Sequence, residues 1–249
     1  MGSKFNENPI GPAFFFRKIY IKSPSSKPIK KAISKENLAL IIGLINGDGH
    51  LQVKETKGTV SFYSKNKKDI DRVIKMFTSY FDVKPLLYQD NRLGDKRYKL
   101  FFASKSLSYF LKDSGAAVGN KTNLPYVLPS WIVKGNNKIK SSYLRGIYDC
   151  EGSIYSQKDG RMRITLTQYR REDLKQYAVN YFNQMKDMLF SFDIKSSPIK
   201  IDKGNERKDG TRTICFRVII EKSSFSNFYK CLDFFDSRKQ KLLCESLKP

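Results

Sequence analysis

Two apolar segments of the chain each end on an acidic residue, Asp48 in LIIGLINGDGHL and Glu151 in YLRGIYDCEGSI. A glycine follows each acid, and small residues recur four positions apart, at Gly43 and Gly47 and at the matching positions of the second copy. Residues four apart lie on one side of a helix, so this spacing predicts two helices whose backbones approach closely. The two carboxylates would then lie side by side at one end of the helix pair.

Adjacent carboxylates repel each other unless a positive charge lies between them. Hard oxygen ligands suit Mg²⁺, which keeps several waters and also binds phosphate oxygens. Such an ion lowers the pKa of water and stabilises the attacking and leaving oxygens of a phosphodiester. The pattern therefore predicts Asp48 and Glu151 as metal ligands and catalytic residues. The alternative, that each acid only meets solvent beyond a buried helix, is weakened because the same motif occurs twice.

The overall charge indicates the class of partner. The 249 residues include 47 Lys and Arg against 24 Asp and Glu, a formal net charge of +23. This excess favours a polyanionic partner, with nucleic acid ahead of an anionic membrane surface. No apolar run approaches the roughly 18 residues that a membrane-spanning helix needs. The four cysteines form no C-x-x-C pair, so we expect reduced thiols in an intracellular protein, with cytoplasm and organelle both open.

Two similar halves follow from the repeated segments, each predicted as helix, hairpin, helix, hairpin, helix. The first has helices from Ser34 or Asn37 to about Asp48, 67–81 and 105–113, and strands 50–56, 59–65, 84–90 and 96–103. The second has helices 138–151, 172–190 and 222–234, strands 153–158, 161–168, 194–203 and 211–220, and a final helix 237–247. The predicted domains are a basic arm (1–33), a half-domain (34–125), a linker (126–137) and a second half-domain (138–249).

The predicted strands alternate apolar residues with basic and polar ones. In GRMRITLTQ, for example, Met162, Ile164 and Leu166 share one face, whereas Arg161 and Arg163 share the other. A sheet with one face packed on helices and the other basic can lie in the DNA major groove, where the base edges are distinguishable.

Together, the two segments and the repeated plan resemble the LAGLIDADG homing endonucleases in their single-chain, two-motif form. The resemblance spans residues 34–247 and departs from the motif letters at Asn46, Gly47, Cys150 and Glu151. It implies an α+β monomer whose two αββαββα half-domains, related by a pseudo-twofold axis, pack through their motif helices and form a saddle of antiparallel sheets on double-stranded DNA. It also implies Mg²⁺ bound by Asp48 and Glu151, with backbone carbonyls of Gly47 and Cys150 as further ligands. We expect Mn²⁺ to substitute and Ca²⁺ to support binding without cleavage.

Further site residues come from the same match. Ser64 and Lys65 in the first half, and Gln168 and Tyr169 in the second, occupy the end of the second strand, near the expected scissile phosphates. Lys65 and Gln168 are the predicted additional catalytic residues, although strand alternation places Gln168 on the core face. The predicted DNA contacts are Lys54, Thr59, Ser61, Tyr63, Ser64, Arg97, Lys99, Arg161, Arg163, Thr165, Thr167, Tyr169, Lys200, Thr213 and Arg217.

The sequence thus predicts a site-specific, double-strand DNA endonuclease of the homing type. The main alternative is an intron maturase that uses the same scaffold to bind RNA. Loss of one or both terminal acids would indicate that alternative, and here both acids are present.

Overall fold

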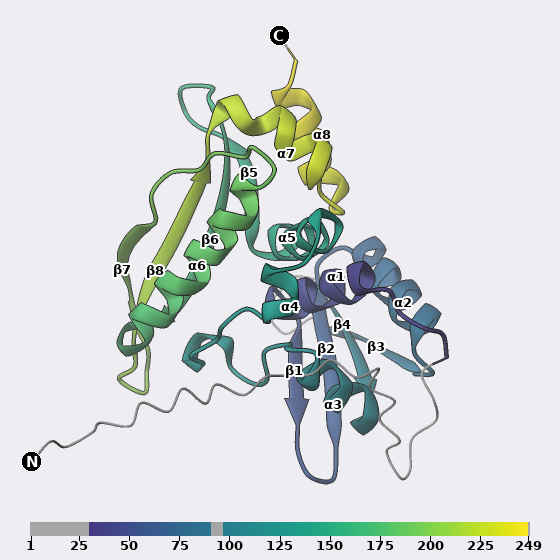
Figure 1. The fold of residues 1–249 in the computed structure, drawn as a ribbon. Helices are drawn as coiled ribbons and strands as arrows, with labels where there is room; N and C mark the ends of the chain where they lie inside the picture. The colour runs from purple at the N-terminus through teal and green to yellow at the C-terminus, as the bar shows by residue number, and fades with distance from the viewer. Residues whose placement is uncertain (1–29, 91–96, 249) are drawn as a thin grey trace, which may run out of the picture.

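The computed structural model describes residues 30–90 and 97–248, which form two halves of the same topology (Figure 1). Each half contains a four-stranded antiparallel sheet, with strand orders β1-β2-β4-β3 and β5-β6-β8-β7. The predicted α+β class with two similar halves is confirmed. Most of the predicted basic arm, residues 1–29, lies outside the described residues. Within the described residues, no helix combines the length and apolar character needed to cross a membrane.

The elements follow the predicted order in both halves. The first half comprises α1 (Lys35–Asn46), β1 (His50–Val53), β2 (Gly58–Ser64), α2 (Lys67–Tyr80), β3 (Pro85–Asp90), β4 (Arg97–Ala103) and α3 (Lys105–Asp113). The connecting segment contains the 3-10 helix η1 (Lys121–Asn123) and α4 (Ser130–Val133). The second half comprises α5 (Asn137–Glu151), β5 (Gly152–Ser156), β6 (Met162–Arg171), η2 (Glu172–Leu174), α6 (Lys175–Phe190), β7 (Lys200–Glu206), β8 (Arg212–Ile220), η3 (Lys222–Ser224), α7 (Phe225–Cys231) and α8 (Ser237–Ser246).

Several boundaries differ from the predictions. The strand predicted over 50–56 ends at Val53, and the helix predicted over 222–234 opens on η3 and ends at Cys231. Three other differences have a local reason. β6 continues to Arg171 because its last residues pair with β8, ending at Thr213. β7 begins at Lys200 rather than near 194, since Pro198 has no N–H to contribute to a strand ladder. The helix predicted to start at 172 opens instead on the single 3-10 turn of η2.

The two motif helices begin at side-chain caps. The Ser34 hydroxyl accepts the N–H of Asn37 at the start of α1, and the Asn136 side chain accepts the N–H of Ile139 at the start of α5. These bonds satisfy N–H groups that the first helical turn leaves unpaired. The caps fix where both helices start, and therefore which residues occupy their far ends.

Glycines permit the contact between α1 and α5. A Cβ atom added at Gly43 would lie 2.5 Å from the Tyr143 carbonyl oxygen, and one at Gly146 would lie 2.7 Å from the Leu40 carbonyl oxygen. One at Gly47 would lie 2.2 Å from the Cβ of Cys150. No side chain fits at these distances, so the predicted close approach of the two backbones is confirmed.

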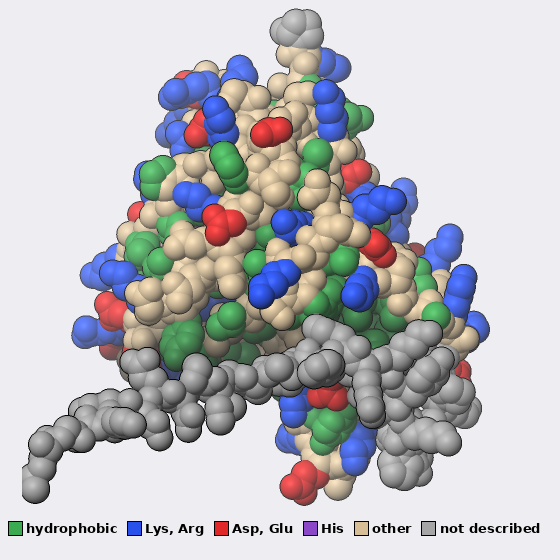
Figure 2. Space-filling view, viewed as in Figure 1, with side chains coloured by type: hydrophobic (Ala, Val, Ile, Leu, Met, Phe, Trp, Pro, Cys, Tyr) green, Lys and Arg blue, Asp and Glu red, His purple; other side chains and the backbone are tan. Residues whose placement is uncertain are grey.

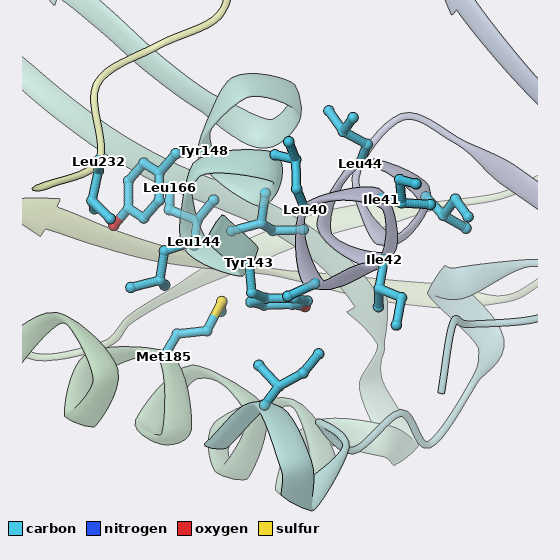
Figure 3. Packing of buried hydrophobic residues seen from close by; sticks show 14 of the residues in the cluster. Leu40, Ile41, Ile42, Leu44, Tyr143, Leu144, Tyr148, Leu166, Met185 and Leu232 are labelled. Carbon is cyan, nitrogen blue, oxygen red and sulfur yellow. The ribbon is translucent and has the colours of Figure 1, made fainter. Parts of the chain in front are cut away.

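The core surrounds this helix pair. Every residue of α1 from Ala39 to Asn46 is buried, which explains why the segment is apolar on all sides. Leu40 of α1 lies between the two helices beside Tyr143 of α5, whereas Ile41 lies on the side of α1 that faces away from α5 (Figure 3). Residues 39–46 of α1 and the inner side of α5 thus lie in one core.

Gly146→Ala should destabilise the protein by about 1–3 kcal/mol, the usual penalty for overpacking a tight interior. Alanine is intrinsically the better helix former by roughly 1 kcal/mol, so a loss can only arise from the contact with α1. The measurement is the urea midpoint of unfolding, with Lys138→Ala on the exposed surface of α5 as the control. An unchanged midpoint for Gly146→Ala would contradict the close contact.

Candidate active site

The ends of α1 and α5 bring two acidic residues together. Glu151 is the last residue of α5, and Asp48 lies two residues beyond the end of α1. The Cys150 thiol lies 3.7 Å from the Leu44 carbonyl oxygen and so connects the last turns of the two helices. Glu151 is half-buried, whereas Asp48 keeps contact with solvent. The predicted pairing of the two carboxylates at one end of the helix pair follows from this packing.

Both carboxyl groups hold protons more tightly than usual. Burial in the surrounding protein raises the pKa of Asp48, although the charges of Lys121 and Lys239 act in the opposite direction. Burial also raises the pKa of Glu151, and the negative charge of Asp48 raises it further. The ionised pair is therefore unfavourable by itself and favours a neutralising cation.

The ligand set suits one kind of metal ion. Among the described residues, no group of three or more His, Cys, Asp or Glu side chains is arranged to hold a metal. Mg²⁺ needs fewer, because it binds through one or two carboxylates and completes its shell with waters and substrate phosphate oxygens. Asp48 and Glu151 supply that number. Burial raises the pKa of the Cys150 thiol, which disfavours the thiolate that a sulfur ligand would need.

The backbone carbonyls of Gly47 and Cys150 were the other predicted ligands. These two residues touch across the helix contact, directly beside the acids. Their position is compatible with a ligand role, which stays a prediction.

Lys121, which was not predicted, joins the site from the connecting segment. Its ammonium group donates hydrogen bonds to the carbonyl oxygens of Ile45, at 3.1 Å, and Gly49, at 2.8 Å, on either side of Asp48. Burial lowers the pKa of Lys121, whereas the nearby charges of Glu151 and Asp48 raise it. One sequence signal could have found it, because Lys121 is the only basic residue between positions 113 and 133.

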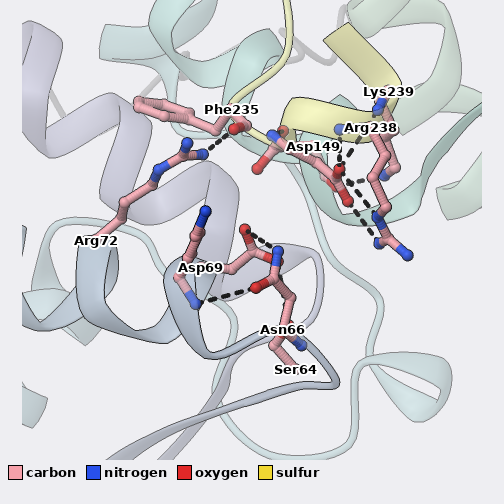
Figure 4. A network of polar contacts seen from close by, with 10 residues as sticks. Ser64, Asn66, Asp69, Arg72, Asp149, Phe235, Arg238 and Lys239 are labelled. Atoms are coloured by element: carbon pink, nitrogen blue, oxygen red, sulfur yellow. Dashed lines mark hydrogen bonds and ion pairs between the residues drawn. The ribbon is translucent and has the colours of Figure 1, made fainter. Parts of the chain in front are cut away.

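Lys239, in the first turn of α8, is the second lysine that the sequence did not reveal. Its ammonium group donates to the Asp149 carbonyl oxygen at 2.5 Å, two residues before Glu151 (Figure 4). Its charge lowers the pKa of both Asp48 and Glu151. Each acid is thus accompanied by a lysine that comes from the segment after the third helix of one half.

The residues predicted near the scissile phosphates are placed differently in the two halves. The Ser64 hydroxyl donates to Asp69 at 3.2 Å and accepts the Asn66 N–H at 3.0 Å, so it is part of the α2 N-terminus. Lys65 is exposed. Gln168 is buried on the core face of β6, as strand alternation predicted, and its side-chain oxygen accepts from Arg170 at 2.7 Å. Catalytic roles for Lys65 and Gln168 stay predictions.

Among residues 30–90 and 97–248, helices pack on one face of each sheet. Phe77 of α2 stacks on Phe102 of β4 with ring centroids 4.9 Å apart, and Phe182 of α6 stacks on Phe216 of β8 at 5.6 Å. The opposite faces, which we call the open faces, carry the alternate residues of each strand. The predicted DNA contacts that strand register places on them are Thr59, Ser61, Tyr63, Arg97 and Lys99 in the first half, and Arg163, Thr165, Thr167, Tyr169, Lys200, Thr213 and Arg217 in the second.

These predicted contacts differ in accessibility. Ser61, Thr165 and Thr213 are buried, and the Thr213 hydroxyl bonds both backbone groups of Asn205 beside a bulge in β7. The two remaining candidates, Lys54 and Arg161, lie exposed in the hairpin turns. Arg161 pairs there with Asp159 at 2.6 Å. DNA contacts by all of these residues stay predictions.

Strand pairing adds residues that the sequence pattern missed. Tyr88 lies opposite Lys99, Tyr155 lies opposite Arg163, and Gln52 lies opposite Thr59. All three are exposed on the open faces. Lys and Arg side chains are also spread over the surface drawn in Figure 2, among fewer acidic ones. The open faces therefore combine positive charge with exposed tyrosines.

A protein-family model identifies the family of this chain. The model of the LAGLIDADG-like domain matches residues 35–115 and 138–232, one segment in each half. The chain belongs to this family. The resemblance seen in the sequence is thereby confirmed, and each matched segment contains one motif helix with its terminal acid.

Curated proteins similar to this LAGLIDADG-like chain are much longer than it is. It is 28% identical over 200 residues to the tRNA-splicing ligase RtcB of Pyrococcus abyssi, covering 74% of this chain and 22% of that protein. It is 26% identical over 202 residues to the Replication factor C small subunit of Methanocaldococcus jannaschii, covering 78% of this chain and 10% of that protein. The chain thus spans less than a quarter of the length of each.

Solved structures with this fold cover most of the LAGLIDADG-like chain. The homing endonuclease I-WcaI bound to its DNA recognition sequence has a TM-score of 0.55 and 18% identity, over 86% of this chain and 88% of that one. I-DmoI in complex with DNA and Ca has a TM-score of 0.52 and 15% identity, over 81% and 91%. At this level of identity the likeness establishes the two-half fold.

The raised carboxyl pKa values predict a pH-dependent stability. In the metal-free protein the folded state binds these protons more tightly than the unfolded state, so stability should fall as the pH rises through about 4 and remain lower above the raised folded pKa values. Asp48→Asn removes one of the two charges and should melt at a higher temperature than the wild type at neutral pH in EDTA. The difference should close near about pH 3, where an unfolded carboxyl group is protonated.

Thermal melts with and without Mg²⁺ measure this effect. The ion should raise the melting temperature of the wild type and leave that of Asp48→Asn nearly unchanged. Glu55→Gln, at an exposed acid in the first hairpin turn, is the matched control for loss of a carboxylate. If Asp48→Asn melts below the wild type at neutral pH in EDTA, the repulsive pair is not present.

Proposed function

We propose that this chain is a site-specific DNA endonuclease that hydrolyses both strands of a long, asymmetric target with the help of a divalent metal ion. The observation that carries the proposal is the pair of acids at the end of the α1–α5 contact, each accompanied by a lysine. Retention of both acids favours cleavage over the alternative of an RNA-binding maturase. The proposed enzyme acts as a monomer because one chain supplies both motifs.

The chemistry assigned to the site rests on its own residues. Asp48 and Glu151 would hold Mg²⁺, or Mn²⁺ in its place, with the carbonyls of Gly47 and Cys150 as additional ligands. When bound, the ion supplies charge neutralisation at the phosphate and a more acidic water. The ammonium groups of Lys121 and Lys239 neutralise part of the negative charge that collects where phosphate and carboxylates meet. The exposed Lys65 would provide a further positive charge at the edge of the first sheet.

The open faces of the two sheets are the proposed DNA-binding surface. Arg97, Lys99, Arg163, Lys200 and Arg217 would meet the phosphate backbone or guanine edges. Tyr63 and Tyr169 are exposed beside them, and their rings and hydroxyl groups can contact bases as well as backbone. The site is therefore expected to read sequence over both halves.

Similar proteins support the proposal. I-WcaI and I-DmoI share the fold and were solved with target DNA, and I-DmoI also with Mg, Mn or Ca. The curated relatives, which include a tRNA-splicing ligase, a replication factor subunit and an aminotransferase, have unrelated activities. A segment shared among such proteins behaves as a separate, transferable module, which is consistent with homing.

A randomised duplex library tests the function even though the target sequence is unknown. Sequences bound in Ca²⁺ are selected, and the bound pool is then transferred to Mg²⁺ and its cut ends are mapped. One long motif cut by the wild type is the expected result. Binding without cutting in either Mg²⁺ or Mn²⁺ would contradict the proposal, and structured RNA would become the next ligand to examine.

Asp48→Asn and Glu151→Gln should each slow cleavage of the selected target on the order of 10³-fold, because several kcal/mol of charge stabilisation are lost. Affinity in Ca²⁺ should change far less, since the open faces are untouched. Single-turnover cleavage and equilibrium binding measure the two effects separately. Glu172→Gln, at an exposed acid of η2, should cut at the wild-type rate. Wild-type cleavage by either acid variant would refute the assigned roles.

DNA binding should weaken steeply with salt, because phosphate contacts release counterions. Lys200→Ala removes one exposed lysine from an open face and should reduce the slope of log affinity against log salt by about 1. Lys75→Ala removes an exposed lysine from α2, on the opposite side of the first sheet, and should leave the slope unchanged. Equal slopes for the two variants would place the DNA elsewhere.

A further inference from the structure

Asn46 and Asp149 occupy equivalent places in the two motifs, two residues before Asp48 and Glu151. The Asn46 side-chain oxygen accepts the backbone N–H of Ala117 at 2.9 Å, and an Asp149 carboxylate oxygen accepts the backbone N–H of Asp236 at 2.9 Å. Ala117 lies four residues before Lys121, and Asp236 lies three residues before Lys239. In both halves, the residue two before the acid therefore binds the segment that carries the active-site lysine.

We propose that Asn46 and Asp149 are positioning residues that hold Lys121 and Lys239 beside the carboxylate pair. This inference rests on the proposed function and extends it to the device that places the lysines. Neither side chain needs to contact DNA or metal for this role, because each acts through the backbone of another segment.

In the first half the bound segment is a strap, residues 115–126, that crosses the end of α1. Asn46 holds it on both sides of Lys121, since its amide nitrogen also donates to the Tyr126 hydroxyl at 2.7 Å. That hydroxyl in turn donates to the Gly115 carbonyl oxygen at 2.9 Å, so the first and last residues of the strap are bonded to each other. A single amide side chain thus anchors a ten-residue stretch from Ala117 to Tyr126 at its two ends.

Other contacts of the strap fall on the same short region. The Gly119 N–H donates to the Leu51 carbonyl oxygen at 2.8 Å, and Lys121 itself bonds the carbonyl oxygens of Ile45 and Gly49. All of these acceptors lie within residues 45–51, the turn that contains Asp48. The strap is therefore held against this region, and two of the bonds fix the Lys121 ammonium group near Asp48, whose pKa it lowers.

The Asn46 side chain is a polar group buried among apolar residues. Only 3% of this residue is exposed, and its neighbours Leu44 and Ile45 are buried and apolar. A polar side chain in such surroundings is unfavourable unless its hydrogen-bonding groups are paired. An aliphatic residue would fill the same space, so binding of the strap accounts for the asparagine.

In the second half Asp149 binds a shorter segment at both ends. Its carboxylate accepts from the Asp236 N–H, and its backbone oxygen accepts from the Lys239 ammonium group (Figure 4). The Asp236 side chain caps α8 by accepting the N–H groups of Arg238 and Lys239. The first turn of α8 is therefore fixed relative to the end of α5, with Lys239 facing the site.

The two positions differ in the chemistry they require. Asn46 uses a donor and an acceptor, so aspartate could bond Tyr126 only by accepting the hydroxyl proton that Tyr126 now donates to Gly115. Asp149 uses its side chain only as an acceptor of backbone N–H groups, so asparagine could replace it. This difference gives the experiment a conservative variant that separates geometry from charge.

The experiment measures the acetylation rate of each lysine by mass spectrometry in the protein without DNA, with acetic anhydride as the probe and the exposed Lys75 as internal reference. Asn46→Ala should raise the rate at Lys121 about tenfold, as expected when a buried hydrogen bond is lost, and leave Lys239 unchanged. Asp149→Ala should raise the rate at Lys239 and leave Lys121 unchanged. Asp149→Asn should restore the wild-type rate at Lys239.

A merely structural role predicts a different pattern. If both lysines react faster in each alanine variant, or if neither does, the positioning role is overturned. Tyr126→Phe keeps the aromatic ring and removes the hydroxyl that Asn46 binds, so it serves if Asn46→Ala does not fold. This variant should raise the acetylation rate of Lys121 alone, and an unchanged rate at Lys121 would also overturn the proposal.

Strand-resolved nicking separates this inference from the proposed function. The selected target is labelled on both strands. Asn46→Ala should lower the nicking rate of one DNA strand, and Asp149→Ala should lower that of the other. A wild-type protein that cuts no DNA, with the acetylation pattern intact, would overturn the endonuclease and leave the positioning role. A wild type that cuts, with both alanine variants nicking both strands at its rate, would overturn the positioning role alone.

Discussion

The contact between the backbones of α1 and α5 is the constraint on which the rest of this structure depends. Gly43 and Gly146 leave no room for a side chain between the helices, so their axes are held closer than larger residues would allow. Both helices start at side-chain caps and end on the same side of the molecule. Two acids that are distant in sequence consequently share one small volume, where the charge of Asp48 raises the proton affinity of Glu151.

The second consequence of this contact is that both halves must complete one site together. The lysine of the first half comes from a strap over α1, and that of the second half comes from the first turn of α8. The segments differ in conformation, one irregular and the other helical, yet each is bound by the residue two before the acid. The two halves therefore share equivalent hydrogen bonds at this position, although the bound segments have different secondary structure.

Local sequence patterns predicted the parts of the site that local physics determines. The small-residue spacing, the terminal acids and the strand alternation are each properties of a few neighbouring residues, and they gave the helix contact, the acid pair and the core-facing position of Gln168. The helix and strand order followed from the same periodicities. Where a residue lacks the N–H that strand pairing needs, as Pro198 does before β7, the observed strand begins later than predicted.

Lys121 and Lys239 could not be predicted in this way. Each reaches the acids through hydrogen bonds to residues more than 70 positions away, and the strap around Lys121 has no periodic pattern. The open-face positions of Tyr88 and Tyr155 were missed for a related reason, because they depend on the register between strands rather than on one strand alone. Long-range pairing, rather than local propensity, decides these features.

Asp48 and Glu151 are proposed to form one shared metal site rather than two independent ones. Titration of Mn²⁺, followed by the electron paramagnetic resonance of the free ion, tests this in the wild type, Asp48→Asn, Glu151→Gln and the double variant. A shared site predicts that either single substitution removes nearly all the affinity that the double variant lacks. Losses that add up from the two single variants would contradict a shared site, and the contact of α1 with α5 would then have another purpose.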